Sequence, residues 1–198
     1  MLQRLLRRFV WPVLRPLARR VKSVDPWDRT EQRVPSSSFG RGSLKDFAWY
    51  FEGESAVVVG SVDDVCAWLV DCAYLHDTEI FNEEDFWQHP RTFERLRQGD
   101  CEDHAIWAWR KLVELGLDAE LVSGMQRGML DTPRAVARGH VWIRFRQDGR
   151  EYILETVAKS RERMIRTFDA AKGDYVPFTG VDGRFQTYTY SGILDAIK

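Results

Sequence analysis

The chain has 198 residues, a formal net charge of −1 at pH 7, 44% hydrophobic residues and 30% charged residues. This length and composition favour one globular domain with an appendage and exclude an intrinsically disordered chain. Residues 1–22 are basic and contain no acid, so the remaining chain is mildly acidic and lacks the charge profile of a nucleic-acid-binding domain.

Residues 1–22 form a basic arm, in which residues 2–21 have the pattern of an amphipathic helix. Pro12 and Pro16 interrupt the pattern, so we expect a kink or two short helices. The apolar runs are too short for a secretory signal or a membrane span. Three interpretations stay open: a peripheral contact with anionic membranes, with Trp11 at the lipid boundary, a helix that docks on this protein or on a partner protein, or a disordered tail.

Residues 23–43 contain Pro, Ser and Gly without apolar periodicity, which predicts a linker. We therefore expect the folded domain to span residues 44–198. Its first predicted helix runs from Val62 to Leu75, with Ser61 as the N-cap.

The three cysteines, Cys66, Cys72 and Cys101, have neither the even number of a disulfide framework nor CxxC metal spacing. Cys66 and Cys72 fall in the predicted helix and are interpreted as packing residues. An odd number of cysteines with one candidate nucleophile is typical of a reducing compartment. We therefore expect a cytoplasmic protein, associated with the membrane surface if the arm binds there.

A second helix is expected between Asp85 and Gln98. Trp87 and Gln88 are candidate oxyanion donors, because acyl transfer needs an N–H donor besides the backbone of the nucleophile. The alternative is that Trp87 is a core aromatic residue and Gln88 a solvated amide.

Residues 101–115 have apolar residues at helical spacing, which predicts a helix with Cys101 in its first turn. The free N–H groups and the positive dipole end of a helix N-terminus favour the thiolate, which is the attacking species. We therefore predict that Cys101 alone has a lowered thiol pKa. The alternative is a buried structural cysteine.

Residues 140–145 and 151–157 alternate as strands around a turn that contains Asp-Gly, which predicts a β-hairpin. The hairpin brings His140, at the start of its first strand, near Glu155, late in its second. A thiol, an imidazole and a carboxylate can act as nucleophile, base and orienting group. His104 and His89 are competing histidines, but His104 lies on the cysteine's own helix, from which a base reaches the sulfur poorly.

The C-terminal third is expected to contain a loop at residues 169–173 and strands at residues 175–178 and 184–190. These strands would extend the hairpin into an antiparallel sheet. The predicted fold class is α+β, with helices on one side of that sheet.

Several segments together resemble the bacterial transglutaminase-like cysteine peptidases, which belong to the papain-like superfamily. These segments are residues 99–103 (Gly-Asp-Cys-Glu-Asp), 116–122, 139–143 and 152–155, and residues 86–90 and 174–177 also resemble that group. The resemblance covers roughly residues 45–190. The family usually has aspartate where this chain has Glu155.

The resemblance implies a papain-like, transglutaminase-like core in which the cysteine helix packs on a small antiparallel sheet. It implies a cysteine-dependent amide hydrolase, most often a peptidase with a protein or peptide substrate, that uses Cys101, His140 and Glu155. The same acyl-enzyme could also serve a transglutaminase or a deamidase. No cofactor is required, but some members hold calcium with the acids that flank the cysteine, here Asp100 and Glu102.

Two other classes of protein stay open. One is a non-catalytic binding module that keeps the fold, which the glutamate at Glu155 favours. The other is a metal site built from Cys101, His104, His140 and nearby carboxylates, although CxxH by itself is poor ligand spacing.

Overall fold

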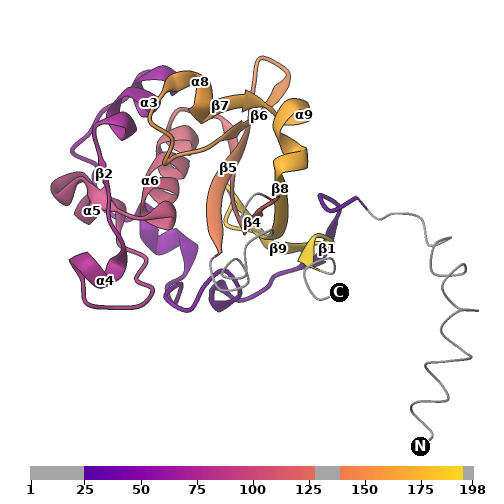
Figure 1. The fold of residues 1–198 in the computed structure, drawn as a ribbon, viewed down its shortest axis with the longest axis horizontal. Helices are drawn as coiled ribbons and strands as arrows, with labels where there is room; N and C mark the ends of the chain where they lie inside the picture. Colours follow the sequence, from indigo (N-terminus) through magenta and orange to yellow (C-terminus); the bar gives the residue numbers. More distant parts are fainter. Residues whose placement is uncertain (1–24, 128–138, 194–198) are drawn as a thin grey trace, which may run out of the picture.

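The computed structural model describes residues 25–127 and 139–193 (Figure 1). Its helices are η1 (Ser36–Ser38), η2 (Phe47–Phe51), α3 (Val62–Val70), α4 (Asp77–Ile80), α5 (Pro90–Leu96), α6 (Cys101–Glu114), α8 (Arg161–Met164), α9 (Phe168–Ala171) and η4 (Lys172–Asp174). Its strands are β1 (Arg29–Gln32), β2 (Ala73–Tyr74), β3 (Gln98–Gly99), β4 (Asp118–Gln126), β5 (His140–Gln147), β6 (Arg150–Leu154), β7 (Ile165–Thr167), β8 (Tyr175–Asp182) and β9 (Thr187–Tyr190).

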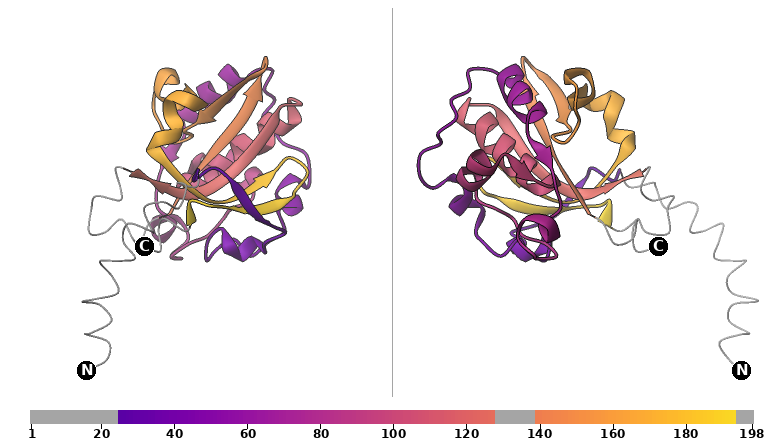
Figure 2. Two further views of the ribbon diagram at one scale, coloured as in Figure 1. Left: turned by 90° about the vertical axis from the view of Figure 1, so that its right-hand side faces the viewer. Right: turned by 60° about the vertical axis from the view of Figure 1, so that its left-hand side comes forward.

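The main sheet contains seven of the described strands in the order β1-β9-β8-β4-β5-β6-β7, and every neighbouring pair is antiparallel. Because side chains alternate between the two faces of a strand, β5 contributes to two cores. Val141 and Ile143 belong to the core shared with α6, whereas Trp142 belongs to a second core on the other face. Helix α9 contributes Ala171 to that second core, so the two sheet faces have different helical covers (Figure 2).

Helix α6 is central because almost every side chain from Cys101 to Leu112 is buried. Its tryptophans, Trp107 and Trp109, are fully buried in the larger core. Burial of aromatic side chains of this size supplies much of the hydrophobic free energy that holds the helix against β4 and β5. The first turn of α6 is therefore fixed at one end of the sheet.

Two buried cations near the end of α6 bind η2 and the segment that follows it. Arg110 donates to the carbonyl oxygens of Tyr50 and Gly53 at 3.3 and 2.6 Å, and Lys111 donates to the carbonyl of Val57 at 2.7 Å. Both also contact Glu114, which keeps the buried charges paired.

The predicted fold class is confirmed: the fold is α+β, and the cysteine helix packs on an antiparallel sheet. The sheet, with seven strands, is larger than predicted. The predicted hairpin is strands β5 and β6, and its turn has positive φ at Asp148 (51°) and Gly149 (73°), as a type I′ turn requires.

Two local predictions were wrong. The first helix ends at Val70 rather than Leu75. Residues 169–173, predicted as a loop, lie in α9 and η4. Ser61 is an N-cap as predicted, since its side chain accepts from the Asp64 N–H.

The described part of the predicted linker packs against the domain. Strand β1 pairs with β9. Trp27, which precedes β1 in the chain, and Phe39, which follows it, are both buried. Arg29 of β1 also binds Glu120 of β4 at 2.7 Å. Residues 25–43 therefore belong to the folded domain, and the prediction of a free linker there was wrong.

The predicted arm, residues 1–22, lies outside the described residues, so its amphipathic helix stays a prediction. Among the described helices, none has the length and apolar character needed to cross a membrane.

Candidate active site

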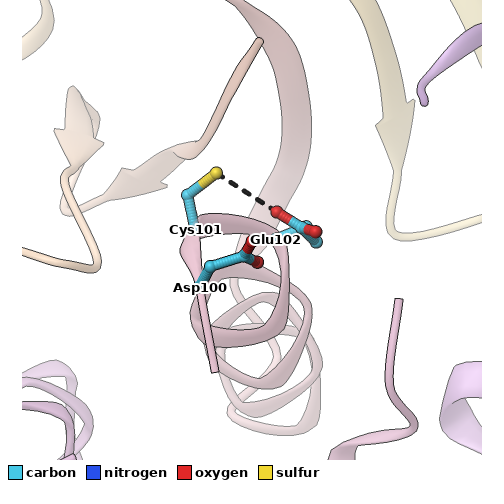
Figure 3. A group of neighbouring side chains, drawn as sticks. All are labelled: Asp100, Cys101 and Glu102. Carbon is cyan, nitrogen blue, oxygen red and sulfur yellow. Dashed lines mark hydrogen bonds between the residues drawn. The ribbon is translucent and has the colours of Figure 1, made fainter. Parts of the chain in front are cut away.

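Cys101 is the first residue of α6 and is 8% exposed. Its Sγ donates to Glu102 Oε2 at 3.2 Å (Figure 3). The backbone N–H of Val141 also interacts with the sulfur, which brings the thiol to the start of β5. Cys101 lines a cavity of about 490 Å³ whose other walls include Trp87, Ser123, Gly139 and Val141.

The predicted lowering of the Cys101 thiol pKa was wrong for this state of the protein. Burial raises its pKa well above the ordinary value, and the charges of Glu102 and Asp100 raise it further. The Val141 N–H acts in the opposite direction, but it is the smaller effect. A helix N-terminus favours an anion, yet burial beside two acids outweighs that preference here.

Five carboxylates surround the cysteine end of α6. Overlapping groups, Asp100 with Cys101 and Glu102, Asp77 with Asp100 and Asp103, and Asp77 with Asp85 and Glu102, each bring their ligand atoms within 4.8 Å of one another. Asp77 and Asp85 come from the segment before α5, and the other three acids come from the start of α6.

Most of these carboxylates are already fixed by protein donors. Asp85 accepts from the Gly42 N–H at 2.8 Å and the Trp87 indole at 3.0 Å, and Asp77 accepts from the Phe86 N–H at 2.6 Å. Asp100 Oδ1 is buried with no hydrogen-bond partner among the described residues.

Close packing of these acids disfavours their charged forms. Burial, reinforced by the neighbouring acids, raises the pKa of Asp77 to about 6 and raises the pKa values of Asp100, Glu102 and Asp103. Protons or a cation would relieve this repulsion.

His140 and Glu155 form the pair that the hairpin predicted. His140 Nε2 lies 2.8 Å from Glu155 Oε2, and both side chains are buried. A carboxylate oxygen accepts, so Nε2 carries the hydrogen and Nδ1 is the nitrogen free to accept a proton. The predicted proximity of His140 and Glu155 is therefore present.

The Cys101 thiol and the His140 ring lie on different faces of β5. His140 shares the face of Trp142, whose ring lies 6.0 Å away, whereas Val141 belongs to the core of α6. In the part of the chain that the structure describes, no hydrogen bond joins the Cys101 sulfur to the His140 ring. The two groups are connected through Val141, the residue after His140.

Trp87 and Gln88, the candidate oxyanion donors, both donate to acids. The Trp87 indole binds Asp85, while Gln88 Nε2 binds the Gln98 carbonyl at 2.9 Å and the Asp103 carboxylate. Gln88 is 1% exposed, so it is not the solvated amide of the alternative interpretation. Either side chain would have to leave its present partner to reach an oxyanion.

Two further residues contact Glu155 that the sequence did not indicate. Tyr175 donates to Glu155 Oε2 at 3.0 Å and Gln126 donates to it at 2.8 Å. Tyr175 stands at the start of a predicted strand and in one of the segments that resemble the family, whereas Gln126 had no signal in the sequence. Asp77 and Asp85, likewise missed, could have been found only as acids upstream of the cysteine motif.

His104, one of the competing histidines, is fully buried, and its ring binds the backbone of its own helix start. Its Nδ1 lies 2.7 Å from the Asp100 carbonyl, and Nε2 has no partner among the described residues. Burial lowers its pKa to about 4. His89 instead caps α5, where its Nδ1 accepts from the Arg91 N–H.

The buried His104 should make stability depend on pH. Its folded pKa lies below the unfolded value of about 6.5, so the unfolded chain binds more protons and stability falls as pH drops from about 6.5 to 4. The free energy of unfolding of the wild type should therefore fall relative to that of His104→Leu by about 3 kcal/mol as the pH drops over this range. Urea unfolding of both proteins at several pH values measures this difference. Both proteins contain the same acids, so the effects of the acids cancel in the comparison. If the difference in unfolding free energy between the two proteins stayed constant with pH, His104 would not be the source of the pH dependence.

No family model matches the chain, and no curated protein sequence matches it. The fold is similar to LapG of Legionella pneumophila, in EGTA-treated and calcium-bound forms, with a TM-score of 0.46 and 16% identity. The matches cover 75% and 85% of this chain and 82% of LapG.

A second similar structure is a candidate cysteine protease from Cytophaga hutchinsonii, with a TM-score of 0.39 and 16% identity. That match covers 75% of this chain and half of the Cytophaga protein.

Proposed function

We propose that the protein is a cysteine-dependent amide hydrolase, most simply a peptidase. The observation that carries the proposal is the position of the Cys101 thiol. It lies at a helix start, in a cavity, at the backbone of Val141, the residue that follows His140 in the chain, and His140 is paired with the buried carboxylate of Glu155. This arrangement assembles a nucleophile, a base and an orienting group from three elements.

In the proposed reaction the Cys101 sulfur attacks the amide carbon and its proton passes to His140 Nδ1. His140 then protonates the leaving amine as the C–N bond breaks, and water hydrolyses the acyl-enzyme. Glu155 holds the Nε2–H tautomer. The Cys101 backbone N–H would contribute to the oxyanion hole, with Trp87 or Gln88 as candidate second donors.

The thiol must leave Glu102, and the sulfur and the His140 ring, which lie on different faces of β5 here, must come into contact before this reaction can begin. Catalytic hydrogen bonds are often long or misaligned without substrate and tighten only in the complex. A peptide that fills the cavity of Cys101 would displace the thiol from Glu102 and exclude water around the sulfur.

A digest of a peptide library, with cleavage sites read by mass spectrometry, tests the proposal. Cleavage at a shared sequence, with an acyl-enzyme trapped on Cys101, supports hydrolysis. Transfer of the acyl group to an added amine in preference to water would instead identify a transglutaminase, and release of ammonia from glutamine would identify a deamidase.

A non-catalytic binding module is the second candidate. The raised thiol pKa and the Cys101–Glu102 hydrogen bond favour it, because both oppose formation of the thiolate. Such a module would bind peptides without cleaving them, and its affinity would not change when Cys101 is replaced.

We further propose that calcium binds at the acids around the first turn of α6. Asp100 and Glu102, predicted from the sequence, are joined there by Asp77, Asp85 and Asp103. Calcium takes six to eight oxygen ligands, and carboxylate oxygens are prominent among them. The buried and unpartnered Asp100 Oδ1 supplies a ligand atom that nothing else in the described residues uses.

Added calcium should raise the melting temperature of the chelator-treated protein, because a ligand that binds only the folded state stabilises it. The shift should be lost or much reduced in Asp100→Asn and Glu102→Gln. Glu84→Gln is the matched control, since Glu84 borders the same cavity but is 76% exposed on its side chain. No shift in the wild type, or an equal shift in Asp100→Asn, would rule out this site.

For residues 1–22 we propose one of two contacts, either with a membrane surface or with a partner protein.

A further inference from the structure

We propose that Tyr175 and Gln126 are positioning residues that hold the Glu155 carboxylate in the orientation that fixes the His140 ring. The expected effect on catalysis rests on the function proposed above. The expected effect on structure, which nitrogen of the His140 ring carries the hydrogen, can be measured without any activity.

A single oxygen of Glu155 accepts three hydrogen bonds. Oε2 lies 2.8 Å from His140 Nε2, 2.8 Å from Gln126 Nε2 and 3.0 Å from the Tyr175 hydroxyl. Gln126 Nε2 is also 3.4 Å from that hydroxyl. Oε1 has no partner among the described residues, so the orientation of the carboxylate depends on the three contacts at Oε2.

The two added donors come from strands that are fixed to one another. Gln126, the last residue of β4, and Tyr175, the first residue of β8, are register partners in the sheet. Glu155 follows β6 directly, and its own N–H donates to the Met164 carbonyl at 2.7 Å. Main-chain hydrogen bonds therefore set the position of both donors before the side chains are considered.

Glutamate needs such support because its side chain has three rotatable bonds, each of which can carry the carboxylate away from the imidazole. A hydrogen bond from His140 alone would leave the carboxylate free to rotate about that contact. Two more donors at the same oxygen restrict it to one place, and hydrogen bonds to an ionised group are among the stronger ones.

Tyr175 is suited to donate rather than accept. It is 2% exposed, and burial beside Glu155 raises its pKa, so the hydroxyl keeps its proton. Its ring packs against Trp142 at 4.7 Å, which holds the hydroxyl toward Glu155. Tyr175→Phe would remove the donor and leave this ring contact in place.

The experiment uses the full-length protein with labelled histidines, whose ring nitrogen shifts report which nitrogen carries the hydrogen. In the wild type His140 should be the Nε2–H tautomer. Tyr175→Phe should reduce the Nε2–H fraction and lower kcat about tenfold with KM little changed, as expected for one hydrogen bond to a charged group. Gln126→Met, which keeps the side-chain length, should act in the same direction.

Tyr190→Phe is the matched control, because Tyr190 is a buried tyrosine of the same sheet that donates to another carboxylate, Glu120. It removes a comparable hydrogen bond away from His140 and should leave the His140 signals unchanged. Tyr175→Phe should also have no additional effect on the ring once Glu155 is replaced by Gln, because Tyr175 acts through that carboxylate.

His140 signals in Tyr175→Phe and Gln126→Met that match those of the wild type would overturn the proposal. If no hydrolysis is detected in any variant, the proposed function fails, and the ring signals still decide whether Tyr175 and Gln126 position the pair.

Discussion

Cys101→Ala should abolish hydrolysis, with kcat falling by at least about 10³-fold once a substrate has been identified. The reason is that the sulfur forms the covalent bond to the substrate, and no other thiol lines the described cavity. Initial rates with the best peptide from the library digest, together with loss of the trapped acyl-enzyme, measure the effect.

Cys66→Ala and Cys72→Ala are the matched controls for Cys101→Ala. Both residues are buried thiols of the same core, and burial raises both of their pKa values. Their replacement should cost packing free energy but leave kcat within a few-fold of the wild type. Retained turnover in Cys101→Ala, or its loss in either control at a temperature where the control is folded, would refute the assignment of the nucleophile.

His140→Ala should lower kcat by about 10²- to 10⁴-fold, the usual range for loss of a general base. The protein should stay folded, which circular dichroism and thermal melting can establish. The measurement is kcat for hydrolysis of the same peptide.

His76→Ala is the matched control for His140→Ala. His76 lines the cavity of Cys101, but it precedes α4 and is exposed. If His76→Ala lost as much activity as His140→Ala, the assignment of His140 as the general base would fail. Full activity in His140→Ala would remove His140 from the mechanism.

The parts of this fold that the sequence predicted are those set by local patterns. The helix at Cys101 follows from apolar spacing over four turns, and the β5–β6 hairpin follows from alternation around Asp148-Gly149. The pairing of His140 with Glu155 could be predicted because a hairpin fixes it within fifteen residues of chain.

The parts that could not be predicted depend on contacts between distant segments. Tyr175 reaches Glu155 only because β8 lies beside β4. Asp77 reaches Asp100 only after the segment before α5 packs on α6. The direction of the Cys101 pKa shift also could not be predicted from local sequence, because it depends on burial and on which acids face the sulfur.

Strand β1 was missed for a different reason. All four of its residues are exposed, so the strand lacks the alternation by which half-buried strands are predicted. The residues that fix it, Trp27 and Phe39, are single aromatic residues outside the strand.

The contact between β1 and β9 also determines where this protein could be shortened. A chain that began at Leu44 would lack Arg29, and Glu120, 5% exposed, would stay buried without its cation. The main-chain groups of β9 would be left open along an edge that also carries Tyr188 and Tyr190. Open edges of this kind are templates for self-association, so the first strand protects the molecule against aggregation.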